Sequence, residues 1–253
     1  MGSDITNINI SGNRFNKMKF LLNFNSKNKK SNIKSIKLVD NVFIQSASSK
    51  NSNNIMINLA SDSQGSFSIG NFTIRDSNFF VKKNAVSIVN VSINNGLDIV
   101  KTKMKSYQGI GAVSLHSSYV NSFAINDLIS NSTLSVPFSD SDNRGVKKFE
   151  LSNSEIATVE FDLNDVAQKK ATINAAINGN KLGSDSTSPI QFKAGQVQIL
   201  EEFHVSNNDF ITNRGLPIFS PPGIINNSPF KGNRLSTLVG EKTERRSLTS
   251  WSR

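Results

Sequence analysis

The segment Phe203-His-Val-Ser-Asn-Asn-Asp-Phe210 indicates the fold class of this 253-residue chain. Phe203 and Val205 alternate with polar residues, which predicts a half-buried strand with both side chains on its inner side. The polar pair Asn207-Asn208 then predicts a sharp corner, because Asn tolerates the left-handed backbone region that a corner needs. Phe210 faces inward again and begins the next strand. The segment therefore predicts two strands joined by a corner.

The same pattern recurs along most of the chain. An aliphatic residue is followed by any residue, a small polar pair, any residue, and then, in most copies, an aliphatic or aromatic residue. The copies begin at Ile10, Leu38, Ile74, Ile93, Leu115, Ile129, Leu151, Ile177, Val205 and Ile225. Most of the intervals between them suit one coil of a solenoid. We therefore expect a stack of coils with these residues buried in one column and very little helix.

Segments such as Ile8-Asn-Ile-Ser-Gly-Asn-Arg-Phe15 resemble coils of right-handed parallel β-helices, the pectate-lyase-like superfamily. This resemblance covers about residues 5–235. It implies an all-β solenoid of about ten coils with Asn-rich corners, in which inward Asn side chains stack in hydrogen-bonded ladders. The alternative fold is an antiparallel β-sandwich, which also has short strands and frequent turns. We favour the β-helix because one corner type recurs and two-residue hairpin signals are sparse.

The prediction treats residues 1–235 as one β-helix domain and residues 236–253 as a polar C-terminal tail. Interruptions of the pattern predict loops near 44–54, 135–148 and 216–223, the last because Pro cannot donate to a central ladder. No amphipathic capping helix precedes the first predicted strand. We therefore expect another chain or domain to cover an end of the rod, with a homotrimer favoured by the resemblance to tailspikes.

The composition restricts the function classes. The chain contains 34 Asn, 38 Ser and no Cys, which excludes helical bundles, disulfide scaffolds and thiolate sites. No apolar run is long enough to span a membrane, and the start does not resemble a signal peptide. The whole net charge of +10 lies in residues 1–120, so we expect anionic partners.

The resemblance includes polysaccharide lyases and hydrolases, phage tailspikes and adhesins, so it leaves the activity open. The family's hydrolases commonly have Asn-Thr-Asp, Asp-Asp and Gly-His-Gly segments, and this sequence has none of them. His116 and His204 are the only histidines, and His204 is predicted to face outward. The weak catalytic candidates are Asp140, Asp142, Glu160 and Asp162, which a coil spacing of 22 residues would gather into one patch. No cofactor or metal site is predicted, although such a patch would suit calcium.

The candidate ligand-binding residues are Lys82, Lys101, Lys103 and Lys105. The last three alternate along one strand, and a spacing of 19 residues places Lys82 beside Lys101. Stacked lysines repel one another unless they are exposed or bind an anion. The preferred interpretation is a non-enzymatic tailspike or adhesin module, extracellular or on a virion, that binds anionic glycan or lipopolysaccharide or acts as a spacer. The alternative is a polysaccharide lyase or glycoside hydrolase, perhaps using Arg144; nucleic acid is not expected, because only Tyr107 lies among the lysines.

Overall fold

The computed structural model describes residues 3–17, 21–26, 30–45, 55–63, 65–107, 111–184, 188–193, 195–197, 199–212, 218–219, 230–239 and 242–248. These residues form 23 strands and contain no helix. Every strand pairing among them is parallel except that of the last two strands. The chain is therefore a parallel β-solenoid, and the β-sandwich alternative is wrong.

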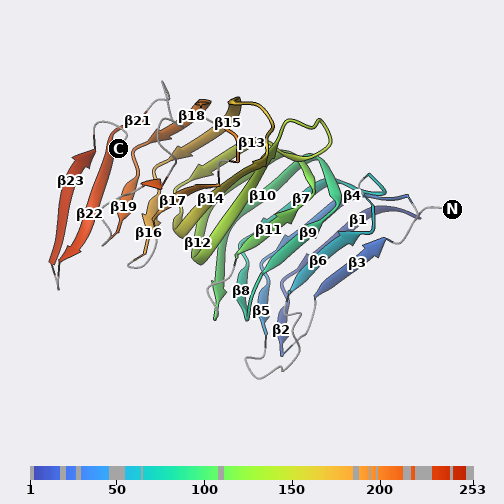
Figure 1. Cartoon of the computed structure of the whole chain (residues 1–253). Coiled ribbons are helices and arrows are strands. Elements are labelled where there is room, and N and C mark those ends of the chain that lie inside the picture. The colour runs from blue at the N-terminus through green and yellow to red at the C-terminus, as the bar shows by residue number, and fades with distance from the viewer. Residues whose placement is uncertain are drawn as a thin grey trace.

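Three faces form the wall of the solenoid (Figure 1). The first face precedes the main corner and contains β1 (Ser3–Ser11), β4 (Ser31–Val39), β7 (Phe67–Arg75), β13 (Gly145–Ser152), β15 (Lys170–Asn178), β18 (Ile199–Ser206) and β21 (Phe230–Lys231). The second face follows the corner and contains β2 (Arg14–Asn16), β5 (Val42–Ile44), β8 (Asn78–Val81), β16 (Lys181–Gly183), β19 (Asp209–Ile211) and β22 (Asn233–Val239). The third contains β3 (Leu22–Ser26), β6 (Ile57–Ser61), β9 (Val86–Val89), β11 (Val113–His116), β17 (Ile190–Lys193) and β20 (Ile218–Phe219).

Three long strands continue from one face to the next. They are β10 (Val91–Ser106), β12 (Tyr119–Ser139) and β14 (Glu155–Asp165). The final strand, β23 (Lys242–Leu248), pairs antiparallel with β22 at the C-terminal end. A strand thus lies within the segment that was predicted as a polar tail.

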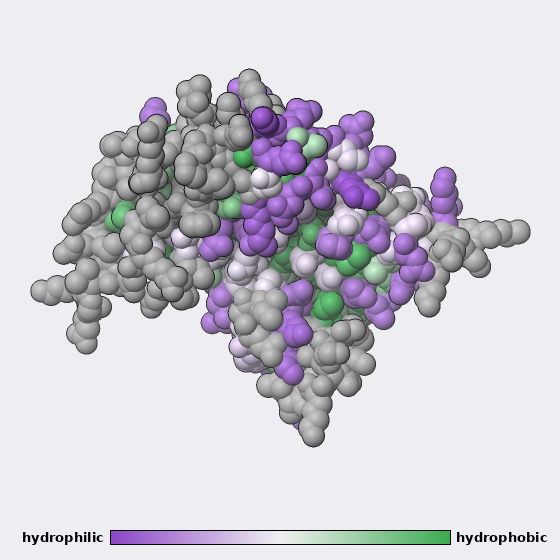
Figure 2. All heavy atoms as spheres, in the orientation of Figure 1, coloured by the Kyte–Doolittle hydropathy of each residue, from purple (hydrophilic) through white to green (hydrophobic). Residues whose placement is uncertain are grey.

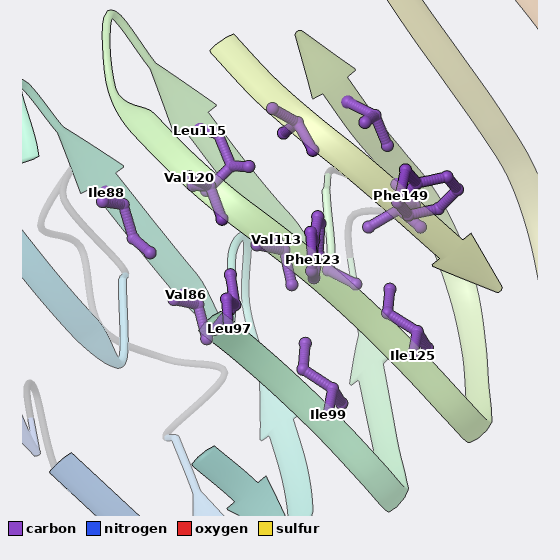
Figure 3. Packing of buried hydrophobic residues seen from close by; sticks show 14 of the residues in the cluster. Val86, Ile88, Leu97, Ile99, Val113, Leu115, Val120, Phe123, Ile125 and Phe149 are labelled. Carbon is purple, nitrogen blue, oxygen red and sulfur yellow. The ribbon is translucent and has the colours of Figure 1, made fainter. Parts of the chain in front are cut away.

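Inward side chains from all three faces fill the interior (Figure 3). The column that precedes the corner contains Ile10, Leu38, Ile74, Ile99, Ile125, Leu151, Ile177, Val205 and Phe230. Ile10 and Phe230 at its ends are half-buried, and the others are buried. Burial of one such side chain stabilises the fold by about 1.5–3 kcal/mol.

The repeat pattern located six of the corners correctly. Ile93 and Leu115 are buried as expected, but they lie in other inward columns. Ile129 is wrong, because it faces outward and is 43% exposed. Ile225 lies outside the described residues. The number of coils and the hand of the helix remain predictions.

The main corner has one backbone conformation throughout. Each corner begins with a residue of positive φ, between 47° and 69°: Gly12, Asp40, Asp76, Lys101, Asp127, Asn153, Gly179, Asn207 and Gly232. The left-handed region turns the chain sharply, and Gly, Asn and Asp reach it most readily. Lys101 shows that a long side chain also occupies this position when the neighbouring coils fix it.

The residue that follows each of these points inward and builds the corner ladder: Asn13, Asn41, Ser77, Thr102, Leu128, Ser154, Asn180, Asn208 and Asn233. The backbone N–H of Asn180 donates to Asn208 Oδ1 at 2.9 Å, and the backbone N–H of Asn208 donates to Asn233 Oδ1 at 3.0 Å. The predicted buried Asn ladders are therefore present, with hydroxyl groups and one leucine at intermediate levels.

The loop predicted over 135–148 is mostly strand. β12 continues to Ser139 and β13 begins at Gly145, so only a short turn separates them. Val136 and Phe138 are buried, which places this segment in the wall. Of the other two predicted loops, 46–54 lies outside the described residues, and 216–223 is described only at β20.

Candidate functional site

The lysines of β10 alternate with inward residues, as the sequence predicted. Thr102 and Met104 are buried at 2% and 1% exposure. Lys103 and Lys105 lie on the outer side of the second face, and Lys105 is exposed. Lys101 differs, because it occupies the corner and has a φ of 47°.

The strand register separates Lys101 from Lys82. The backbone N–H of Asp76 donates to Val100 O, and Val100 pairs with Asn126, so Asp76 and Asp127 flank Lys101 in the corner column. The assumed spacing of 19 residues is therefore wrong here, since this coil is longer. Two carboxylates beside one ammonium group partly balance its charge.

Lys82 instead lies beside Tyr107. The backbone N–H of Lys82 donates to Gln45 Oε1 at 2.9 Å, and its carbonyl accepts from Ser106 Oγ at 3.1 Å. Tyr107 N–H donates to the carbonyl of Val81 at 2.9 Å. These bonds fix the turn after β8 against the end of β10, so Lys82 lies near Lys105.

Apolar side chains lie among these lysines. Lys105 pairs with Phe80, and Lys103 pairs with Ile129. Tyr107 is 62% exposed and Ile129 is 43% exposed, and the only other exposed large hydrophobic residue of the described chain is Ile5. We name this surface the lysine face; its members are Lys82, Lys83, Lys103, Lys105, Phe80, Tyr107 and Ile129. Figure 2 shows how hydrophobic residues lie singly among hydrophilic ones on the visible side of the described chain.

The structure does not gather the predicted acidic patch. Asp162 pairs with Pro137 and Glu160 with Ser135, so Asp140 does not lie beside Asp162. Asp140 Oδ2 instead accepts backbone N–H groups of Ala167 at 2.8 Å and Gln168 at 3.2 Å. The prediction failed because it treated strand residues as part of a loop.

Asp142 is exposed in the turn after β12, and Glu160 forms an ion pair with Lys193 at 2.8 Å. The hydrogen bond to Glu160 raises the pKa of Lys193, against the opposing effect of desolvation, and the charges of Glu160 and Asp162 raise it further. A lysine that acts as a general base needs a lowered pKa. This pair therefore suits an exposed ion pair rather than a proton-abstracting base.

The sequence analysis missed a column of ionisable residues on the first face. Asp98 pairs with Ala124, which pairs with Glu150 on the next coil. Glu150 pairs with Ala176, which pairs with His204. Asp98, Glu150 and His204 thus lie two coil steps apart, with alanines between them. The sequence alone could not align them, because coil lengths vary.

Burial raises the pKa of Asp98, and the charge of Arg75 opposes this effect. Glu150 is about half exposed and forms an ion pair with Lys148 at 2.6 Å. The two carboxyl groups therefore have different environments, which is the condition for separate acid and base roles.

The remaining candidates lie apart. His116 is exposed on the third face, whereas His204 is exposed on the first. Arg144 is exposed in the turn before β13. No group of three or more His, Asp or Glu side chains suited to a metal ion occurs among the described residues.

The described part of the chain has no helix of the length and apolar character that would cross a membrane. Comparisons with known proteins add no relative: the chain matches no family model, no curated protein and no solved structure.

Proposed function

We propose that the chain is a non-enzymatic, rod-like surface or virion module of the tailspike or adhesin type, which binds an anionic glycan through the lysine face. One observation carries the proposal. Residues 42–45, 78–83 and 103–107 lie together on this face and contain four lysines and no Asp or Glu. A cluster of one sign attracts polyanions over a distance of about one Debye length.

The apolar members of the lysine face suit a sugar chain. Phe80, Tyr107 and Ile129 offer flat or convex apolar surface beside the ammonium groups. Sugar rings carry apolar C–H faces as well as hydroxyl and acidic groups, so one chain contacts both kinds of side chain. The glycan part of a lipopolysaccharide has the same chemistry. An extracellular location and a homotrimer belong to the same proposal.

The test is a binding titration with a sulfated glycan (heparin), a carboxylated glycan (polygalacturonate) and neutral dextran. The triple variant Lys82→Gln, Lys103→Gln and Lys105→Gln should bind the two acidic glycans about threefold to a hundredfold more weakly, because each exposed pair contributes about 0.2–1 kcal/mol. The matched control replaces Lys148, Lys181 and Lys193 by Gln. It removes the same charge from lysines that already have carboxylate partners.

Affinity of the wild-type chain should fall strongly as salt rises from 0.1 M to 1 M, where the screening length decreases from about 10 Å to about 3 Å. Equal losses in the two triple variants would refute the lysine face as the site. Binding of dextran as strong as that of the acidic glycans would refute the electrostatic argument. Tighter binding of a single-stranded oligonucleotide would assign the face to nucleic acid instead.

A second candidate function is glycoside hydrolysis at the column of Asp98 and Glu150. Two coil steps separate them by about 9.6 Å at the backbone. Inverting glycosidases place their carboxyl groups about 6.5–9.5 Å apart, so that one protonates the glycosidic oxygen while the other activates a water molecule. The raised pKa of Asp98 favours it as the acid.

Release of reducing sugar from acidic and neutral glycans tests this second candidate. Activity that Asp98→Asn and Glu150→Gln each abolish, and that Asp76→Asn leaves intact, would establish it. No release of reducing sugar by the wild-type chain would eliminate it.

A further inference from the structure

The N-terminal coil is open to solvent on its outer side. Its inward residues Ile8, Ile10, Phe15, Leu22 and Phe24 are only partly buried, and Ile5 is 37% exposed. Their neighbours on the next coil are buried: Ile33, Ile36, Leu38, Phe43, Ile57 and Leu59 have exposures of 0–1%. The interior of the rod therefore ends in an uncovered apolar surface.

The backbone of this coil is also unpaired on one side. Among the described strands, β1 pairs only with β4, β2 only with β5, and β3 only with β6. Edge strands of this kind present free N–H and C=O groups and accept further strands readily. A surface with both features has the form of a docking site for another β-coil.

The C-terminal end is built differently. There β23 turns back and pairs antiparallel with β22. Its sequence, Lys242-Thr-Glu-Arg-Arg-Ser-Leu248, contains four charged residues in seven. Charged edge strands resist further pairing. The contrast between the ends indicates that the N-terminal coil alone suits strand addition.

A cavity of about 250 Å³ lies at this open end. It is lined by Ile5, Phe24, Asn25, Ser26, Ser31, Ile33 and Phe67. Its walls come from β1, β3, β4 and β7. A cavity of this kind can receive one large apolar side chain of a partner, as anchor residues do at the centre of interfaces.

Charge selects the occupant. Residues 1–30 contain six Lys or Arg and one Asp, so this coil carries +5 of the net +10. A second copy docked end to end would bring two such coils together, and like charges would oppose it. A cyclic trimer about the rod axis would place three open ends side by side and leave each uncovered. A glycan would not pair with the free backbone groups or bury the apolar surface.

We propose that the N-terminal coil docks a polypeptide partner that adds an extended strand or coil with an acidic rim. The partner's backbone pairs with β1 and β3, its apolar residues cover Ile5 and Phe24, and its carboxylates face the basic rim. Backbone pairing supplies affinity in such strand addition, and the side chains supply specificity.

The test uses two peptides with the sequence of β4, Ser31–Val39, the strand that already pairs with β1 on its inner side. In the first peptide Glu replaces Lys34 and Lys37, and the second keeps both lysines. With the whole chain, the acidic peptide should slow amide hydrogen exchange in β1 and bind at least about tenfold more tightly than the basic one. The variant Ile5→Glu should weaken this binding about tenfold or more, and Ile129→Glu, at an equally exposed apolar residue on another face, should not.

Protection of β1 by both peptides equally, or by neither, would overturn the proposal, and so would undiminished binding by Ile5→Glu. Light scattering provides a further arm. Self-association of the wild-type chain that Ile5→Glu abolishes would show that a second copy occupies this end, which also contradicts the proposal. These outcomes concern the rod end and leave glycan binding at the lysine face untouched.

Discussion

The substitution Asn208→Ala should destabilise the solenoid strongly although it removes only a small polar group. Asn208 is 1% exposed. Its Oδ1 accepts from the backbone N–H and from Nδ2 of Asn180, both at 2.9 Å. Its Nδ2 donates to the carbonyl of Ile177 and to Asn233 Oδ1, both at 3.0 Å. The truncation therefore leaves buried groups on two neighbouring coils without these partners.

The magnitude follows from the groups that are left unpaired. A buried donor or acceptor without a partner costs about 1–3 kcal/mol, and the backbone N–H and an amide hydrogen of Asn180 are both affected. We therefore expect a loss of about 2–6 kcal/mol in the free energy of unfolding, which is a large part of the about 5–15 kcal/mol of a typical domain. Reversible urea unfolding measures this loss, and an unchanged m-value would show that the unfolded state is not altered.

Asn178 supplies the control, because its Oδ1 also accepts two hydrogen bonds, at 2.9 Å and 3.0 Å, but on the exposed side. Water replaces these partners, so Asn178→Ala should change the free energy of unfolding by about 1 kcal/mol or less. A loss for Asn208→Ala as small as that for Asn178→Ala would refute the reasoning. The corner ladder would then contribute little to stability.

Three further outcomes follow from particular residues. Burial raises the pKa of Asp98 above 3.8, so its ionised form is disfavoured in the folded chain, and Asp98→Asn should be at least as stable as wild type near pH 7 and should lose that advantage below pH 3.8; a variant less stable at pH 7 would contradict this. The pKa of Lys193 is raised above 10.5, so its pair with Glu160 stabilises fully below that pH and less as pH rises through the raised value; the stability difference from Lys193→Met should shrink there, and a constant difference would count against the pair. Gly183→Ala should destabilise by more than about 2 kcal/mol, because its φ is 130° and a Cβ would lie 1.8 Å from a backbone carbonyl oxygen of β19, whereas Gly12→Ala, with φ 67° and open space, should cost about 1 kcal/mol by thermal or urea unfolding; equal losses would disprove the steric argument.

The corners were predictable where their chemistry is local. At Asp40-Asn41 and Asn207-Asn208 both residues favour the required conformations, so a short polar pair identifies the corner. At Lys101-Thr102 and Asp127-Leu128 the corner has the same backbone but not the polar pair. There the neighbouring coils impose the conformation, and no local pattern records it.

The candidate site was predictable only within single strands. The outward alternation of Lys103 and Lys105 follows from the two-residue period of a strand. Which residues lie beside them depends on the lengths of the coils, which range from 25 to 36 residues between successive corner positions. The assumed spacings of 19 and 22 residues therefore misplaced Lys82 and Asp140.

The make-up of the corner ladder divides the rod into regions of unequal register control. Toward the N-terminus, amide-to-side-chain bonds link Asn13, Asn41 and Ser77, and toward the C-terminus a second series runs from Leu128 through Ser154 to Asn233. Among the described residues no such bond joins Ser77 to Thr102 or Thr102 to Leu128. Burial, which is not directional, holds these central levels instead. The register of β10 shifts near this region, between Ile93 and Leu97. The centre of the rod is therefore where a coil can gain or lose a residue without breaking a polar ladder, whereas both ends constrain coil length.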